Sequence, residues 1–323
     1  MQAISVLASS ELKWQETEDP VLSPSEVLIE IKATAINRAD LMQRRGLYPP
    51  PPGASPIMGL ECAGVVVQVG DQVSRHQVGD RVCALLAGGG YAELTAVDEG
   101  SVIPIPEGLD FSQAAALPEV FATAWLNLFI EAGLQPGERV LLHAGASGVG
   151  TAAIQLCRAF GAESYVTAGS EDKIATCLTL GASQGFDRNQ GGFSEALQAF
   201  WADGVDVVLD PVGAGYLADN LKVLRMNGRL ILIGLMSGAR TEIDLAQLMM
   251  KRIRVIGSTL RARPLPEKAA IMAELEQFVW PKITTGVIKP IIETIMPIEQ
   301  ANEAHDLVSS DTTVGKVVLS VAG

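Results

Sequence analysis

Residues 138–160 carry the residue types and spacing that point most directly to chemistry. The apolar run 139–143 predicts a buried strand, and within 151–160 the apolar residues recur at helical spacing. Between these segments lies a turn of small residues that includes Gly145, Ser147, Gly148, Val149 and Gly150. Small residues let the backbone approach a pyrophosphate, whose charge is stabilised by the free N–H groups of a helix N-terminus. This stretch therefore predicts dinucleotide binding.

The turn alone is a weak signal, because Ser147 stands where the usual G-x-G-x-x-G pattern has its second glycine. A tight structural turn in another kind of α/β protein is the alternative. The context favours the dinucleotide site, since strand-like runs follow with helix-length segments between most of them, at 165–167, 184–186, 205–210, 229–234 and 253–257. Such alternation predicts right-handed βαβ units and a doubly wound parallel sheet.

Length and charge limit the possible organisation and partners. A chain of 323 residues exceeds the usual single core, so we expect about two domains. The formal net charge of −13 opposes contact with phosphate backbones and with anionic lipid, and no basic run offsets it. We therefore expect neither nucleic acid nor a membrane as a partner.

Four cysteines are too far apart in the sequence to form a zinc knot or a redox pair: Cys62, Cys83, Cys157 and Cys177. Their apolar neighbours predict core thiols in a reducing compartment. Residues 1–6 lack a basic region and a long apolar core, and no run reaches membrane-spanning length. These features predict a cytoplasmic protein.

The N-terminal part of the chain differs from the alternating part. Up to about residue 117 it is rich in short strand-like runs broken by turns, at 27–32, 64–69, 80–86 and 91–97, which predicts a small barrel-like β unit. Helical periodicity follows over 114–131. The tail, with a predicted helix over 267–280 and a strand over 315–321, is too small to fold alone. We expect it to return and complete the first domain.

Six motifs in this order make the chain similar to the zinc-independent quinone oxidoreductase branch of the medium-chain dehydrogenase/reductase superfamily. They read "AINRADLMQRRGLYPPPPGAS", "GLECAGVVVQVG", "VGDRV", "HAGASGVGTAAIQL", "LDPVGAGY" and "VGKVVLSV". The resemblance covers nearly the whole chain. It implies an α/β protein with a GroES-like β-rich catalytic domain over 1–117 and 261–323, and a Rossmann domain with a doubly wound parallel sheet over 118–260.

The metal ligands of the zinc enzymes in that superfamily are missing here. Those enzymes use a Cys and a His–Glu pair, whereas this chain has Asn37 and Arg38 at the first position and Gly59, Leu60 and Glu61 at the second. Zinc prefers Cys and His in a closed set, so Glu61 alone cannot hold it. The three histidines lie in different segments. We therefore expect no catalytic metal.

Three residues of the β-rich domain are implied by the resemblance to be catalytic: Asn37, Asp40 and Tyr48. Tyr48 could stack on a flat acceptor or donate a hydrogen bond to it, and Asn37 could bond an acceptor carbonyl or the nicotinamide ribose. The alternative is that Asn37 and Asp40 cap a short helix beginning near Arg38, while Tyr48 only shields the cleft.

The cofactor is expected to be NADPH. NAD-preferring enzymes place an acid at the end of the second Rossmann strand, where this chain has Gly169 and Ser170, followed by Lys173. A hydroxyl and a cation suit the 2′-phosphate of NADPH, and Arg188, where relatives often have a Tyr, could pair with it. Glu171 and Asp172 are interpreted as acids of the first helical turn. The alternative is that Lys173 and Arg188 are solvated surface charges.

The rest of the cofactor site is assigned by resemblance alone. Thr123 matches a residue that lies near the nicotinamide in the family. The residues that match the family's cofactor-lining positions are Gly234, Leu235, Met236, Thr259, Leu260 and Lys316. Ordinary core packing is the alternative for Leu235, Met236 and Leu260.

The resemblance implies an NADPH-dependent quinone oxidoreductase that transfers hydride to a quinone or a related electrophile without metal. One alternative is an enone or enoyl reductase, for which Tyr48 is the obvious acid. A non-catalytic NADPH-binding protein is the other. We also expect a homodimer, because an apolar edge formed by 229–234 and 253–257 would invite pairing.

Overall fold

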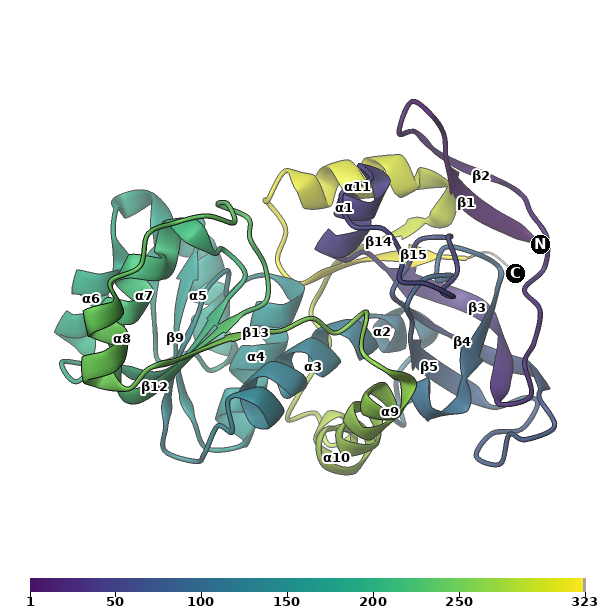
Figure 1. Cartoon of the computed structure of the whole chain (residues 1–323). Coiled ribbons are helices and arrows are strands. Elements are labelled where there is room, and N and C mark those ends of the chain that lie inside the picture. Colours follow the sequence, from purple (N-terminus) through teal and green to yellow (C-terminus); the bar gives the residue numbers. More distant parts are fainter. Residues whose placement is uncertain (322–323) are drawn as a thin grey trace. The chain divides into compact units, whose positions relative to one another are not determined.

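The computed structural model describes residues 1–321, which divide into two compact units (Figure 1). The first unit comprises Met1–Ala122 with the segment that begins at Leu260, and the second comprises Thr123–Thr259. Each unit has its own hydrophobic core. The boundaries expected from the sequence are 117/118 and 260/261.

The second unit is built on a six-stranded sheet in which every neighbouring pair is parallel. The strand order is β10-β9-β8-β11-β12-β13, so the chain winds outward from β8 in one direction and then from β11 in the other. The strands are β8 Arg139–Leu142, β9 Glu163–Ala168, β10 Gln184–Asp187, β11 Val205–Asp210, β12 Leu224–Leu232 and β13 Arg254–Gly257. The predicted doubly wound parallel sheet is confirmed.

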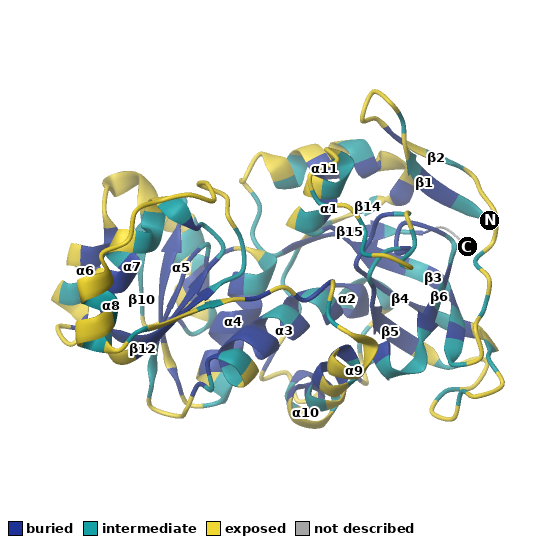
Figure 2. Ribbon diagram, in the orientation of Figure 1, coloured by how far each residue is buried: buried dark blue, intermediate teal, exposed yellow. Residues whose placement is uncertain are grey.

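Helices connect these strands, as right-handed crossovers require. They are α4 Gly148–Ala159, α5 Glu171–Leu180, α6 Phe193–Phe200, α7 Leu217–Val223 and α8 Leu245–Lys251. Figure 2 shows that α8 exposes much of its surface, and none of its residues is buried. The central strand β11 is buried along its whole length, which explains the uninterrupted apolar run of Val207, Val208 and Leu209.

The first unit contains a seven-stranded, largely antiparallel sheet. Its path is β14-β15-β3-β4-β5-β7, and β6 also pairs with β3. The strands are β3 Glu26–Ala35, β4 Glu61–Val69, β5 Arg81–Leu85, β6 Leu94–Asp98, β7 Val102–Pro104, β14 Ile292–Pro297 and β15 Lys316–Ser320. The tail strand β15 pairs with β3, so the tail returns to the β-rich unit. No sequence pattern predicted the hairpin of β1 Gln2–Val6 and β2 Leu12–Glu16.

Two of the predicted helices are interrupted. The segment expected to be helical over 114–131 forms α2 Phe111–Ala115, α3 Pro118–Trp125 and a π-helix, Leu126–Glu131. Pro118 explains the first break, because proline suits the first position of a helix and not its interior. The tail likewise forms α9 Leu265–Glu274, a π-helical turn and α10 Trp280–Thr284, before α11 Ala301–Ser309. A short helix, α1 Arg38–Arg44, follows β3.

Two sequence-based expectations concern burial and membranes. All four cysteines are buried free thiols, as predicted. Burial raises the pKa of each thiol, which suppresses its reactivity. Within residues 1–321, no helix combines the length and apolar character needed to cross a bilayer.

Candidate functional site

The glycine-rich turn leads directly into helix α4, which begins three residues earlier than the periodicity indicated, at Gly148. Ser147 is its N-cap, and its Oγ accepts a hydrogen bond from the N–H of Gly150 at 3.1 Å. This explains the serine at the position of the second glycine, because a capping side chain satisfies one orphan N–H group. The N–H groups of Gly148 and Val149 belong to the same first turn, which has no preceding carbonyls to bond.

Two glycines of the turn lie where no side chain fits. A Cβ on Gly150 would come within 2.5 Å of the carbonyl oxygens of Ala144 and Gly145, and a Cβ on Gly145 would come within 2.6 Å of Val166 Cβ. The turn is therefore a cradle of bare backbone at a helix N-terminus. These residues fit the pyrophosphate of a dinucleotide.

The residues expected to determine the preference for NADPH over NADH lie at and near the end of β9. A Cβ on Gly169 would be 3.2 Å from Arg188 Nη2, so the guanidinium lies against the bare backbone at the strand end. Asn189 Nδ2 donates a hydrogen bond to Gly169 O at 2.8 Å, which holds the Arg188 segment there. Ser170 caps α5 by accepting from Lys173 N at 3.3 Å. Glu171 and Asp172 lie in the first turn of α5, as interpreted from the sequence.

The loops after β11 and β12 contact each other, because Met236 N donates to Pro211 O at 3.3 Å. A Cβ on Gly234 would lie 2.7 Å from Pro211 O, which explains the glycine. Leu235 and Met236 are exposed, so the alternative of core packing is wrong for both. Leu260 is buried and belongs to the first unit, and Thr259 is the exposed last residue of the second.

A buried polar chain lies beneath the turn. His143 Nδ1 is 2.9 Å from Thr167 Oγ1, and His143 Nε2 is 2.7 Å from Asn220 Oδ1. Asn220 Nδ2 in turn donates to Asp210 Oδ2 at 2.9 Å. Since the Asn220 oxygen must accept, His143 carries its proton on Nε2 and accepts from Thr167. Burial lowers the pKa of His143 to about 4, so the ring is neutral.

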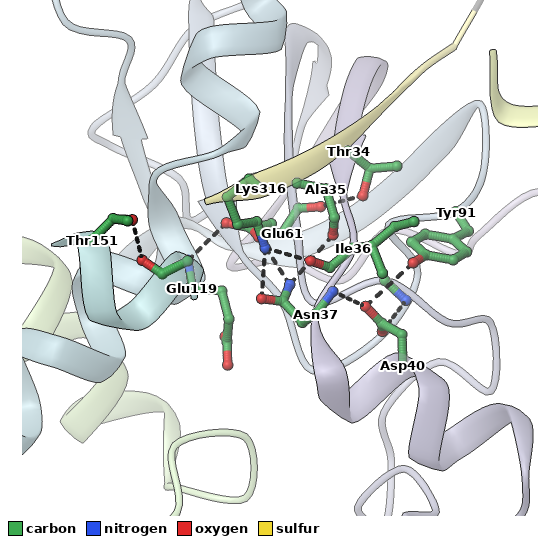
Figure 3. Close-up of polar contacts among 12 residues, drawn as sticks. Thr34, Ala35, Ile36, Asn37, Asp40, Glu61, Tyr91, Glu119, Thr151 and Lys316 are labelled. Atoms are coloured by element: carbon green, nitrogen blue, oxygen red, sulfur yellow. Dashed lines mark hydrogen bonds and ion pairs between the residues drawn. The ribbon is translucent and has the colours of Figure 1, made fainter. Parts of the chain in front are cut away.

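In the first unit, the side chains of Asn37, Glu61 and Lys316 are bonded to one another (Figure 3). Lys316 Nζ donates to Asn37 Oδ1 at 2.7 Å and to Ile36 O at 2.6 Å, and pairs with Glu61 Oε1 at 2.7 Å. Asn37 Nδ2 also donates to Glu61 Oε1, at 2.9 Å. Glu61 and Lys316 are both buried. All three N–H donors of Lys316 are therefore used, and it can act on a cofactor only through its charge or by positioning Asn37.

Asp40 has the structural role that the sequence left open. Its carboxylate accepts from Asn37 N at 2.8 Å and from Gly59 N at 3.2 Å, which caps α1. Tyr91 OH donates to Asp40 Oδ2 at 3.3 Å and is 3.1 Å from His305 Nε2. Burial raises the pKa of Asp40 to about 6, against the effect of these hydrogen bonds. Asn37 is the N-cap residue of α1, and its side chain also bonds Glu61 and Lys316.

Tyr48 is half-buried in the loop after α1, and the guanidinium of Arg261 lies over its ring at 5.2 Å from the centroid. Arg261 also donates to Ala87 O at 2.8 Å and to Gln43 Oε1 at 2.7 Å, which fixes it in place. Burial raises the pKa of the Tyr48 phenol. The ring is thus held firmly with its hydroxyl protonated.

Sequence reasoning did not single out three charged residues of this unit: Glu119, Arg261 and Lys268. Glu119 is the residue after Pro118 at the start of α3, and its N–H donates to Glu61 Oε2 at 2.9 Å. A lone acid in the apolar stretch 114–125 was the signal that could have found it. Thr123, the predicted nicotinamide neighbour, follows one turn later, in the second unit, and its carbonyl accepts from Asn127 Nδ2 at 2.7 Å.

The donor chemistry of the described chain does not suit a metal. Across residues 1–321, no group of three or more His, Cys, Asp and Glu side chains is placed to hold a metal ion. Asn37 and Glu61, from the two segments where the sequence lacks the expected zinc ligands, are both bonded to Lys316.

Two family models match the chain. Residues 23–107 match the alcohol dehydrogenase GroES-like domain, and residues 148–277 match the domain described as zinc-binding dehydrogenase. The rat quinone oxidoreductase is 33% identical over 326 residues, covering 99% of this chain and 97% of that protein.

Solved structures agree with this comparison. The Escherichia coli quinone oxidoreductase complexed with NADPH is 29% identical, with a TM-score of 0.86 over 99% of this chain and 98% of its own. The CurK enoyl reductase is 30% identical, with a TM-score of 0.85 over 99% of both chains.

Proposed function

This chain belongs to the medium-chain dehydrogenase/reductase superfamily, and we propose that within it the protein is an NADPH-dependent quinone reductase that works without metal. Its superfamily makes it an oxidoreductase with a nucleotide-binding fold. The proposal adds the acceptor, the choice of cofactor and the absence of a metal.

One observation supports the proposal: Glu61 and Asn37 are both bonded to the buried cation of Lys316, which occupies the place that a metal would need. A metal at this position would have to displace a buried ion pair and would find no soft ligands. The site therefore suits an acceptor that takes a hydride without a Lewis acid. Quinones meet this requirement, because the product hydroquinone is aromatic and orientation alone can supply much of the rate.

When bound, the cofactor supplies the hydride. The chain's residues would do the rest: the backbone of the turn at Gly145–Gly150 would hold the pyrophosphate, and Tyr48 would orient a flat acceptor under Arg261. Asn37, held by Lys316, has a second lone pair on Oδ1 that could accept from a ribose hydroxyl. Asp40 would keep Asn37 in register by capping α1.

NADPH is proposed over NADH because the guanidinium of Arg188 lies against Gly169 at the end of β9, where NAD-preferring enzymes place an acid. The hydroxyl of Ser170 and the cation of Lys173 would add to this site. The Escherichia coli relative was solved as a complex with NADPH, which supports the same choice.

An enone or enoyl reductase is the second candidate, favoured by the similarity to the CurK enoyl reductase. That reaction needs a proton on carbon or on the enolate oxygen, and therefore a positioned acid. A protein that binds NADPH without catalysis is the remaining alternative.

The test is a panel of ortho-quinones, para-quinones and enones, each assayed with NADPH and with NADH. We expect NADPH-dependent quinone turnover that a chelator leaves intact. Faster turnover of enones than of any quinone would favour the second candidate. NADPH binding without turnover of any acceptor would contradict both reductase proposals.

A further inference from the structure

The buried polar chain of Thr167, His143, Asn220 and Asp210 crosses the middle of the parallel sheet in the second unit. Thr167 lies on β9 and His143 directly follows β8, whereas Asp210 ends β11. Strands β8 and β11 are neighbours, and the polypeptide winds away from them in opposite directions. In doubly wound sheets, a dinucleotide binds across this switch point, at the carboxyl ends of the strands. The polar chain therefore joins the two halves of the nucleotide-binding fold.

Each end of the polar chain belongs to a residue that also holds a loop at the carboxyl edge of the sheet. At one end, the carbonyl of Thr167 accepts a hydrogen bond from Gly145 N at 2.9 Å, which holds the glycine-rich turn. At the other end, Asp210 Oδ1 accepts from Val212 N at 2.6 Å and from Gly213 N at 3.1 Å, which holds the loop after β11. One set of bonds thus fixes loops on both sides of the switch point.

The loop after β11 in turn holds the loop after β12. Ser237 donates to Val212 O from both its N–H and its Oγ, at 2.8 Å each, and its Oγ accepts from Gly215 N at 2.8 Å. A Cβ on Gly213 would lie 3.1 Å from Leu235 Cα, so the two loops are in close contact. Leu235 is one of the residues expected to line the cofactor. Its backbone is therefore positioned through the bonds that Asp210 makes.

His143 lies at the centre of the polar chain, and both of its ring nitrogens are bonded. Its ring also packs against Phe193 and Tyr216, with both centroids 4.7 Å away, and Tyr216 ends the helical turn Ala214–Tyr216 of the loop after β11. The four members of the polar chain are at most 3% exposed. Water cannot readily replace a bond lost there, so the loss of one member leaves a buried polar group unsatisfied and disturbs the others.

Resting on the nucleotide site of the function proposed above, we propose that Thr167, His143, Asn220 and Asp210 are positioning residues that set the two halves of this site at the spacing of a dinucleotide. They act through the turn and the loops that they hold. A dinucleotide is two nucleotides joined through a pyrophosphate, so binding of its second half is intramolecular once the first half is bound. The gain from this linkage depends on the spacing of the two halves of the site.

The test compares a whole dinucleotide with its parts. Titrations at neutral pH measure the affinity of the full-length protein for NADPH, for 2′,5′-ADP and for reduced nicotinamide mononucleotide. His143→Leu removes both ring bonds and should weaken NADPH about tenfold or more, while each half-ligand changes by no more than about threefold. Equal losses for NADPH and 2′,5′-ADP would indicate general damage to the fold and would overturn the proposal, as would an unaltered affinity for NADPH.

Two matched variants separate positioning from stability. His143→Gln can keep both bonds, because its amide donates to Asn220 and accepts from Thr167, so it should retain the affinity of the wild type for NADPH. Ser164→Ala removes a buried hydroxyl of β9 that has no hydrogen-bond partner within residues 1–321, and it should leave all three affinities unchanged. A loss in His143→Gln as large as that in His143→Leu would contradict the role of the bonds.

Thr167→Val tests the same chain if His143→Leu does not fold. It removes one hydroxyl at nearly constant volume and should weaken NADPH more than either half-ligand; equal effects on all three would overturn the proposal. The outcome is independent of the acceptor, so a wild type that reduces no quinone refutes the reductase function and leaves these measurements decisive. If the wild type prefers NADH, NADH and 5′-AMP replace NADPH and 2′,5′-ADP. A wild type that binds neither dinucleotide would overturn the inference directly.

Discussion

Tyr48 is proposed to orient a flat acceptor without taking part in proton transfer. Its ring is fixed under Arg261, and burial keeps its phenol protonated. If it only orients a flat acceptor, Tyr48→Phe retains the ring and the cation contact, and we expect quinone turnover to fall modestly. If Tyr48 were a general acid, loss of its hydroxyl would lower the turnover rate by about 10²-fold or more. Steady-state kinetics and NADPH titration of the variant would check this.

A collapse of quinone turnover in Tyr48→Phe, with NADPH affinity unchanged, would show that the phenol acts in the chemical step.

His143 allows a prediction about stability at the scale of a single residue. Its pKa falls from 6.5 to about 4 on burial, so between these values the unfolded chain binds a proton that the folded chain excludes. The wild type should therefore lose stability as the pH falls through this range. In His143→Gln, the amide can donate to Asn220 and accept from Thr167 without titrating.

Urea unfolding of the wild type and His143→Gln at a series of pH values would measure the difference. The two free energies of unfolding should run parallel above pH 6.5 and diverge below it, with the wild type losing more. His305, whose pKa burial lowers to about 3, contributes to both proteins and cancels. Parallel curves down to pH 4 would show that the ring does not stay neutral.

At the scale of elements, the junction of β9 and α5 is where cofactor choice is tested. If Arg188 and Lys173 bind the 2′-phosphate, a group that NADH lacks, Arg188→Ala or Lys173→Ala should weaken NADPH binding and leave NADH binding little changed. A charge-assisted contact is worth a few kcal/mol at most, so a loss of about 10- to 100-fold in NADPH affinity is expected. Lys13→Ala, on the other unit, is the control. Equal affinities of the unmodified protein for both cofactors would refute the assignment.

Local patterns were sufficient to predict the elements that carry the dinucleotide site. The strand, turn and helix around Gly145 are close in sequence, and the buried strands β8 and β11 have the apolar runs that parallel sheets require. Hydrophobic periodicity did not predict the elements correctly where a proline interrupts a helix or where a strand alternates only weakly. The hairpin β1–β2 and strand β14 went unpredicted, because each is short and depends on distant pairing partners for its stability.

The polar network of the first unit could not be read from local pattern at all. Lys316 meets Asn37 across 279 residues of sequence, and Arg261 meets Gln43 across 218. A single sequence contains no signal for such pairs. Asn37, Tyr48 and Lys316 were therefore predicted by resemblance, without any indication of the residues that hold them in place.

At the scale of the whole molecule, the second unit leaves an apolar edge uncovered. Strand β13 is the last of its sheet, and Val255 on it is exposed. Helix α8, which packs against the neighbouring strand β12, exposes Leu245, Met249 and Met250. An unpaired strand edge beside exposed apolar side chains favours association with another chain.

We therefore expect at least a homodimer in which β13 strands pair about a two-fold axis and extend the sheet through both subunits. Val255→Lys places a charge on that edge and should shift the protein toward monomer, because charged side chains block edge pairing. Val21→Lys, which changes an exposed valine of the first unit, should leave the assembly intact. Light scattering at micromolar concentration measures both variants. A monomeric wild type would refute the dimer, and a dimer unaffected by Val255→Lys would place the interface on another surface.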